Sequence, residues 1–224
     1  MLFSLTRGMA DQFILANLFR YITFRSGAAC LTALVLSLVL GPVVIRWLRS
    51  VQRGGQPIRE DGPARHLVEK KGTPTMGGVL ILLSLTISTL LWTDLRNGYV
   101  WAVLLLTLGY GAIGFVDDYM KLSKRNTKGV SGRTKLVFQV VMGLACATFL
   151  ATLTKGALGT GLTLPVFKEV LIPLGIFFPL VGMFVMIGAS NAVNLTDGLD
   201  GLAIVPTIIA AGVFALISYL VGNR

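Results

Sequence analysis

The sequence predicts an all-α membrane protein, a polytopic bundle of transmembrane helices whose N-terminus lies outside the cytoplasm. Its 224 residues are 54% hydrophobic and only 13% charged, whereas soluble domains carry about a quarter charged residues. Six apolar runs come within a few residues of the ~20 helical residues that cross a bilayer. None of these runs alternates between apolar and polar residues, and an open sheet cannot satisfy its backbone in lipid, so the spans are predicted to be helices.

The six runs define the predicted spans, and together they make residues 1–224 one predicted transmembrane domain. The fifth run contains Pro173 and Pro179, which we expect as kinks that neighbouring helices accommodate. Apolar residues between positions 13 and 22 predict an interfacial helix that leads into the first span. The runs cover residues 27–45, 76–92, 99–116, 136–154, 171–189 and 202–221.

The basic residues orient the bundle. Alternate loops of a helical membrane protein lie on one side, and the cytoplasmic side carries an excess of Lys and Arg. Three loops, at about 46–75, 117–135 and 190–201, carry thirteen of the twenty basic residues, and the other side carries seven. These three loops are therefore predicted to be cytoplasmic. The net charge of +10 follows from the same rule, so we expect membrane lipid around the protein and no nucleic-acid partner.

Four aspartates gather on the predicted cytoplasmic side. Asp117 and Asp118 follow the third run, and Asp197 and Asp200 lie in the loop after the fifth run, which has no basic residue. Adjacent carboxylates repel each other, and charges beside a membrane need pairing, hydration or a metal. Carboxylates of this kind suit Mg²⁺, which takes one or two of them together with phosphate oxygens. Ordinary solvated loop acids are the alternative interpretation.

The neighbours of these acids fit a phosphate-bearing substrate. Asp197 and Asp200 are three residues apart, which places them on one face of a helix, and Thr196 is a candidate N-cap for that helix. Lys70 and Lys135 each lie at a boundary between a loop and a span, beside the predicted site, where they suit an anionic ligand. The cytoplasmic excess of positive charge explains most of the other basic residues.

Three polar segments carry the most specific pattern in the chain. They are Lys-Lys-Gly-Thr-Pro-Thr-Met-Gly-Gly at 70–78, Gly-Phe-Val-Asp-Asp-Tyr at 114–119, and Asn-Ala-Val-Asn-Leu-Thr-Asp-Gly-Leu-Asp-Gly-Leu-Ala at 191–203. Together they closely resemble the phospho-N-acetylmuramoyl-pentapeptide transferases (the MraY family) of glycosyltransferase family 4. The resemblance covers nearly the whole chain, with the motifs in the same order.

The resemblance implies a reaction and its residues. Phospho-MurNAc-pentapeptide would pass from UDP-MurNAc-pentapeptide to undecaprenyl phosphate, giving lipid I and UMP in the first membrane step of peptidoglycan synthesis, with Mg²⁺ as cofactor. Asp117 and Asp118 would be catalytic and candidate Mg²⁺ ligands, one of them accepting a proton from the lipid phosphate or carrying a covalent intermediate. A second set would bind substrate: Lys70, Thr75, Asn194, Asp197, Asp200 and Lys135.

The resemblance also implies a setting for the enzyme and a missing part. Family members lie in the bacterial inner membrane with a cytoplasmic active site, commonly form homodimers, and have roughly ten spans, of which six are predicted here. A further metal-binding Asp in a Phe-Met-Gly-Asp-type motif and a His-rich loop are expected, and neither occurs in residues 1–224. We therefore expect a C-terminally truncated chain that is inactive by itself.

Three alternatives compete with this assignment. A UDP-GlcNAc:polyprenyl-phosphate GlcNAc-1-phosphate transferase would share the metal and mechanism and differ in its sugar nucleotide, although residues 73–78 favour the muramoyl-pentapeptide branch. A transporter or ion channel would place its acids near the bilayer midplane, whereas these aspartates lie at the ends of spans. An inactive remnant or membrane scaffold would keep the fold without the reaction.

Overall fold

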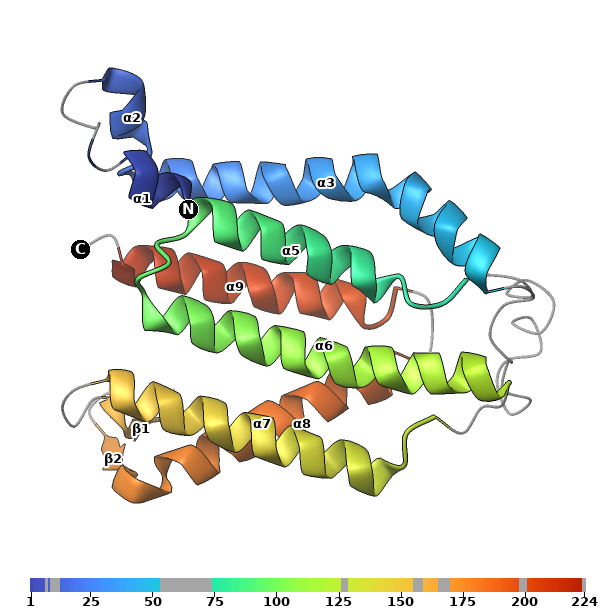
Figure 1. Ribbon diagram of the computed structural model, residues 1–224. Helices are drawn as coiled ribbons and strands as arrows, with labels where there is room; N and C mark the ends of the chain where they lie inside the picture. Colours follow the sequence, from blue (N-terminus) through green and yellow to red (C-terminus); the bar gives the residue numbers. More distant parts are fainter. Residues whose placement is uncertain are drawn as a thin grey trace. The chain divides into compact units, whose positions relative to one another are not determined.

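The computed structural model describes residues 1–6, 8, 13–52, 74–125, 129–154, 159–164, 170–197 and 201–222. These residues form long helices and one short two-stranded sheet, which confirms the predicted all-α class (Figure 1). Within this described part of the chain, five helices are long and apolar enough to cross a membrane, so the chain is a multi-pass membrane protein. Internal contacts divide it into two compact units, Met1–Phe138 and Gln139–Arg224, and each is described by itself. One transmembrane domain over the whole chain stays a prediction.

The first unit is built around three apolar helices, α3, α5 and α6. Two short helices, α1 and α2, precede them, and α2 is the helix predicted between positions 13 and 22. The long helices extend into two of the predicted loops, because α3 continues to Val51 and α6 continues to Lys124. The bounds are α1 Leu2–Thr6, α2 Ile14–Leu18, α3 Ile22–Val51, α5 Gly78–Trp92 and α6 Gly98–Lys124.

Helix α5 packs against both α3 and α6 (Figure 1). Polar side chains join α3 to α5, since Ser37 Oγ donates to Ser84 Oγ at 3.2 Å and Trp92 Nε1 donates to Thr32 Oγ1 at 2.9 Å. Interhelical hydrogen bonds of this kind contribute to helix association where lipid is the solvent. On the other side, a β-carbon at Gly111 of α6 would collide with the side chain of Leu82, so the absent side chain permits close approach.

The second predicted span is shorter than a membrane helix normally is. It corresponds to α5, which has 15 residues and at 1.5 Å per residue measures about 22 Å. A hydrocarbon core is ~30 Å thick. Among the described helices, five are long enough to cross it and α5 is not, so the number of six spans stays a prediction. The side on which the N-terminus lies stays a prediction. Gly77 and Gly78, which belonged to the predicted span, instead form the turn and first residue of the helix.

The long helices display large apolar side chains on their outer surfaces. In α3, for example, Leu38 is 67% exposed and Val39 is 64% exposed. A soluble protein rarely exposes contiguous apolar surface of this extent. The same surface is favourable when lipid surrounds the helix, because burial between helices then brings no hydrophobic gain.

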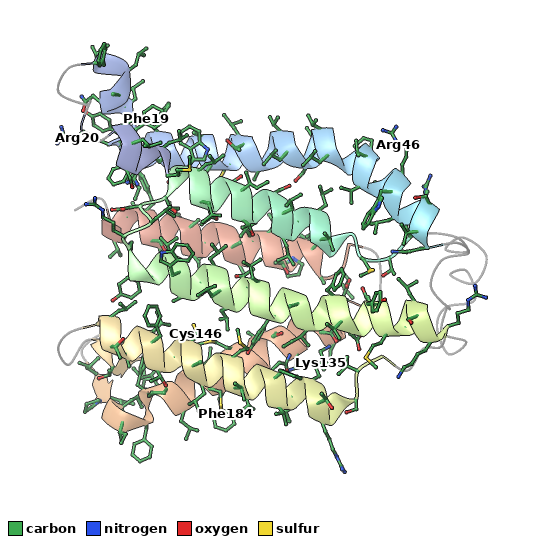
Figure 2. The ribbon with its side chains drawn as sticks, viewed as in Figure 1. Phe19, Arg20, Arg46, Lys135, Cys146 and Phe184 are labelled. Carbon is green, nitrogen blue, oxygen red and sulfur yellow. The ribbon has the colours of Figure 1, made fainter. Side chains whose placement is uncertain are left out.

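Within the described residues, the second unit contains most of α7, the helices α8 and α9, and a two-stranded antiparallel sheet. Helix α7 (Gly132–Leu153) begins in the first unit and packs in the second against α8 (Phe178–Thr196), where a β-carbon at Gly182 would lie 3.1 Å from Ala147 Cβ. Ala147 is fully buried, whereas Phe184 projects away from α8 and is 64% exposed (Figure 2). Helix α9 (Ile204–Gly222) is the last described element.

The predicted start of the fifth span is wrong. Its first residues form strand β2 (Leu171–Pro173), which pairs antiparallel with β1 (Gly161–Thr163), and a 3-10 turn η2 (Gly175–Phe177) leads into α8. The two prolines are therefore not kinks inside a helix, since Pro173 ends a strand and Pro179 lies in the first turn of α8, where a missing N–H is harmless. Gly175, with φ of 50°, makes the turn between them.

Candidate active site

Helix α6 carries Asp117 and Asp118 on its last turns. The apolar run stops at residue 116, but the helix continues to Lys124 and ends at Arg125 in the left-handed conformation. The continuation places Lys121 one turn after both acids, at the i,i+4 and i,i+3 positions. Residues at these spacings face each other on a helix. The two aspartates are thus held on a regular helix and not in a loop.

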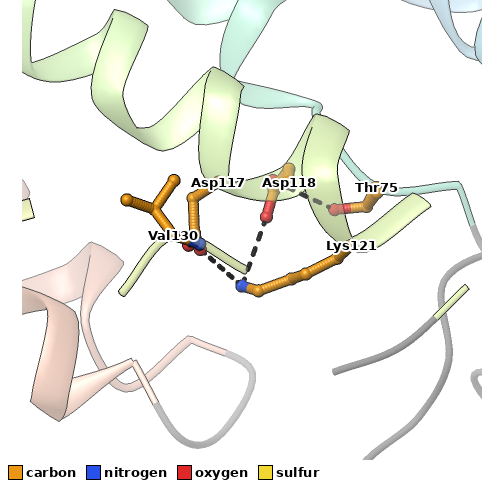
Figure 3. Close-up of polar contacts among 5 residues, drawn as sticks. All are labelled: Thr75, Asp117, Asp118, Lys121 and Val130. Atoms are coloured by element: carbon orange, nitrogen blue, oxygen red, sulfur yellow. Dashed lines mark hydrogen bonds and ion pairs between the residues drawn. The ribbon is translucent and has the colours of Figure 1, made fainter. Parts of the chain in front are cut away.

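Asp117 has the more enclosed of the two carboxylates. Its Oδ2 lies 2.6 Å from Lys121 Nζ, and its Oδ1 accepts a hydrogen bond from the backbone N–H of Val130 at 2.8 Å (Figure 3). Lys135, on the first turn of α7, is close enough for its charge to act on Asp117 as well. With 16% of its side chain exposed, Asp117 is oriented by two contacts, one from Lys121 on α6 itself and one from the segment that precedes α7.

A glycine makes this approach to Asp117 possible. A β-carbon at Gly129 would collide with the Asp117 carboxylate and would lie 2.8 Å from Lys121 Cε. The next residue, Val130, donates the hydrogen bond to Asp117, and Ser131 then caps α7, because Thr134 N donates to its Oγ at 3.2 Å. Neither Gly129 nor Val130 was among the predicted site residues.

Asp118 faces a different partner. Its Oδ2 accepts a hydrogen bond from Thr75 Oγ1 at 3.3 Å, and its Oδ1 lies 3.7 Å from Lys121 Nζ (Figure 3). One ammonium group therefore contacts both carboxylates, which offsets part of the repulsion between neighbouring acids. Asp118 has 31% of its side chain exposed, so this carboxylate is the more accessible one.

Thr75 is itself held by Gln52, which was not among the predicted site residues. The side-chain amide of Gln52 binds the backbone of Thr75 twice, accepting from its N–H at 2.9 Å and donating to its carbonyl at 3.0 Å. Gln52 caps the end of α3 and is only 8% exposed. No short motif marks a single Gln at a helix end, so no signal in the sequence pointed to it.

The structure brings together four of the eight predicted site residues, all in the first unit: Thr75, Asp117, Asp118 and Lys135. Lys70 and Asp200 lie outside the described residues. Asn194 and Asp197 lie at the end of α8 in the second unit, and both are exposed. Their predicted participation in the same site stays a prediction.

The end of α8 differs from the prediction in one detail. Thr196 is the last residue of α8, and its hydroxyl donates to the carbonyl of Ala192 at 2.8 Å. Asp197 follows as the C-cap, with its N–H bonded to Val193 O. The predicted role of Thr196 as an N-cap is therefore wrong, because α8 runs through the position at which a new helix was expected to begin.

The described residues offer a limited ligand set for a cation. Among them, no three His, Cys, Asp or Glu side chains gather. The adjacent pair on α6 nevertheless presents hard carboxylate oxygens on a partly exposed surface. A Mg²⁺ ion that also binds substrate phosphates needs only one or two protein carboxylates, so the pair fits such an ion.

Comparison with known proteins agrees with these motifs. Residues 100–224 match the model of glycosyl transferase family 4, and residues 70–82 match phospho-N-acetylmuramoyl-pentapeptide-transferase signature 1. Three relatives bear the name phospho-N-acetylmuramoyl-pentapeptide-transferase. The Granulibacter bethesdensis protein is 75% identical over 224 residues, all of this chain and 62% of the relative.

The other two relatives are more distant. The Gluconobacter oxydans protein is 60% identical over 208 residues, which cover 93% of this chain and 57% of the relative. The Maricaulis maris protein is 52% identical over 229 residues, which cover the whole of this chain and 62% of the relative. The chain thus spans about three fifths of the length of the curated relatives it matches.

Proposed function

The chain belongs to glycosyl transferase family 4, and from that premise we propose that it carries the catalytic aspartates of a phospho-N-acetylmuramoyl-pentapeptide transferase. One observation supports this most strongly. Thr75 lies in the segment that matches the transferase signature, Asp118 lies in the segment that matches the family, and the two side chains are hydrogen-bonded. Two segments matched independently therefore meet at a pair of carboxylates.

The proposed reaction is a phosphoryl transfer. An oxygen of undecaprenyl phosphate attacks the phosphorus that bears MurNAc-pentapeptide, and a new pyrophosphate bond forms. The bond between that phosphorus and the oxygen bridging to UMP breaks, and UMP leaves with the bridging oxygen. Such transfers depend chiefly on positioning and on stabilising charge at the phosphoryl oxygens. The UDP-GlcNAc transferase, whose sugar nucleotide differs, is the alternative that the assay below separates.

Each residue of the first unit has a role in this proposal. Asp117 and Asp118 would hold the cation, and one of them would accept a proton from the lipid phosphate. In the two-step alternative, one of these carboxylates would attack the phosphorus and expel UMP, and the lipid phosphate would then displace the carboxylate. When bound, Mg²⁺ would neutralise charge on the pyrophosphate and help UMP to leave. Lys121 keeps the two acids paired, and Lys135 adds positive charge for the substrate phosphates.

The remaining predicted residues complete the proposed substrate site. Asn194, Asp197 and Asp200 would bind the nucleotide-sugar, and Lys70 would bind phosphate. We place the site at the cytoplasmic face of the bacterial inner membrane, because the three segments predicted to be cytoplasmic carry thirteen of the twenty basic residues. A homodimer is part of the same proposal.

Transfer of radiolabelled phospho-MurNAc-pentapeptide to undecaprenyl phosphate tests the proposal. The assay would use the 224-residue chain and a version completed with the part of the Granulibacter protein outside the match, each with Mg²⁺ or EDTA. We expect lipid I from the completed version and its loss with EDTA. Consumption of UDP-GlcNAc in its place would assign the sister activity, and no transfer from either UDP-sugar would refute both.

A further inference from the structure

The segment before α5 is held by one buried side chain. Gln52 uses both atoms of its amide on the backbone of Thr75, 23 residues away in the sequence. This pair of hydrogen bonds satisfies a peptide N–H and C=O as a neighbouring strand would. A buried amide fully used in this way is a specific contact, because leaving either partner unpaired is unfavourable.

The backbone around Thr75 needs such support. Pro74 has no N–H to donate, and Met76 has φ of 71°, a left-handed conformation that is unfavourable for a residue with a side chain. Strained residues of this kind persist where surrounding contacts fix them, and they are common at functional sites. Thr75 lies between the two, so the Gln52 amide is the contact that fixes this turn.

This turn places the hydroxyl of Thr75 against the carboxylate of Asp118. Thr75 Oγ1 donates to Asp118 Oδ2, and Asp118 Oδ1 is left facing Lys121 (Figure 3). The contacts therefore run from the end of α3, through the segment before α5, to the carboxylates of α6. All of these residues belong to the first unit.

We propose that Gln52 is a positioning residue, which fixes the Thr75 backbone so that the Thr75 hydroxyl orients the Asp118 carboxylate. The inference rests on the proposed transferase function. Gln52 lies outside both matched segments, residues 70–82 and 100–224. Fixing a reacting group in place contributes to rate because a displacement of about 1 Å can lower it on the order of a hundredfold.

A double-mutant cycle in the completed enzyme distinguishes positioning from simple packing. Gln52→Met keeps the length of the side chain and removes both hydrogen bonds, and we expect kcat to fall about tenfold or more, with KM values changed less than about threefold. In a Thr75→Val background the same change should have little further effect, because the hydroxyl it positions is gone. Equal losses in both backgrounds would overturn the inference.

The matched control removes a hydrogen bond between α3 and α5 themselves. Ser37→Ala breaks the contact with Ser84 on α5, and we expect kcat to stay near that of the wild type. A loss as large as that of Gln52→Met would show that any weakening of the α3–α5 contact lowers activity. That result would also overturn the positioning role.

Hydrogen exchange gives a readout that does not depend on activity. In the peptide that spans residues 74–78, the Thr75 amide should exchange about tenfold faster or more in Gln52→Met and at the wild-type rate in Ser37→Ala. Unchanged protection would overturn the contact itself. If exchange changes as expected but the wild-type enzyme transfers neither UDP-sugar, the proposed function fails and the positioning role with it. If transfer is intact and only the Gln52 effect is missing, the inference alone fails.

Discussion

The ends of two helices carry aspartates that the sequence presents alike and the structure treats differently. At the end of α6, Asp117 and Asp118 are partly enclosed and bound by a lysine, a backbone N–H and a hydroxyl. At the end of α8, Asp197 is exposed, and in the described residues its only hydrogen bond is the backbone bond of the helix cap.

The difference suggests that the carboxylates at the two helix ends have different roles. Charges that are oriented before a ligand arrives need no reorganisation during a reaction, and such preorganisation is a large part of catalysis. An exposed carboxylate can bind a ligand but is not oriented by the protein beforehand. We therefore expect substitutions on α6 to act on kcat and substitutions at the end of α8 to act on KM.

The largest expected effect is at Asp117. Asp117→Asn removes the negative charge that pairs with Lys121, and we expect kcat of the completed enzyme to fall about a thousandfold. Asp94→Asn is the matched control, because Asp94 accepts a hydrogen bond from the Arg96 N–H in the connection between α5 and α6. A kcat of Asp117→Asn within threefold of that of Asp94→Asn would show that Asp117 is not a catalytic residue.

Gly129→Ala should have the next largest effect. The new β-carbon would collide with the Asp117 carboxylate, so either the loop or the acid must move, and we expect kcat to fall about a hundredfold. Gly132→Ala is the control, since nothing lies within 4 Å of a β-carbon there. Equal kcat values for the two variants would show that the loop yields without moving Asp117.

Asp197→Asn should show that the acid at the end of α8 acts on KM, whereas the acids at the end of α6 act on kcat. We expect KM for the UDP-sugar to rise about tenfold while kcat changes little, because an exposed group contributes mainly uniform binding. Steady-state kinetics with varied UDP-sugar at saturating lipid phosphate measures both constants. A fall in kcat without a rise in KM would show that Asp197 acts as Asp117 and Asp118 are expected to act. The proposed difference between the two helix ends would then be wrong.

The smallest expected effect is on stability. Lys121→Met removes the ammonium group that contacts both Asp117 and Asp118. Each such pair contributes about 0.2–1 kcal/mol, so the free energy of unfolding should fall by no more than about 2 kcal/mol. Mg²⁺ should raise the thermal midpoint of Lys121→Met by more than that of the wild type, because the two acids are then unpaired. Lys124→Met, one turn closer to the helix end, is the control. An equal Mg²⁺ response in all three proteins would contradict cation binding by the pair.

Parts of the site were predictable because they depend on neighbours in the sequence. The adjacency of Asp117 and Asp118 at the end of an apolar run was visible, and their spacing from Lys121 could have shown the ion pair. Gln52 could not be found this way, because its partner Thr75 is 23 residues away and the connection depends on how α3 and α5 pack. Gly129 was missed for the same reason, since only the fold brings it against Asp117.

The fold, like the site, has features that the sequence predicts and features that depend on tertiary packing. The sequence by itself determined the long apolar segments, the all-α class and the concentration of charge in a few short segments, because transfer of a side chain between water and lipid is a local property of each residue. Tertiary structure alone decided where helices begin and end, as at Phe178, where a hairpin and a glycine turn replace the expected first turns of a span. It also decided which acids are held in place, since hydrogen bonds between distant segments form only after the helices have packed.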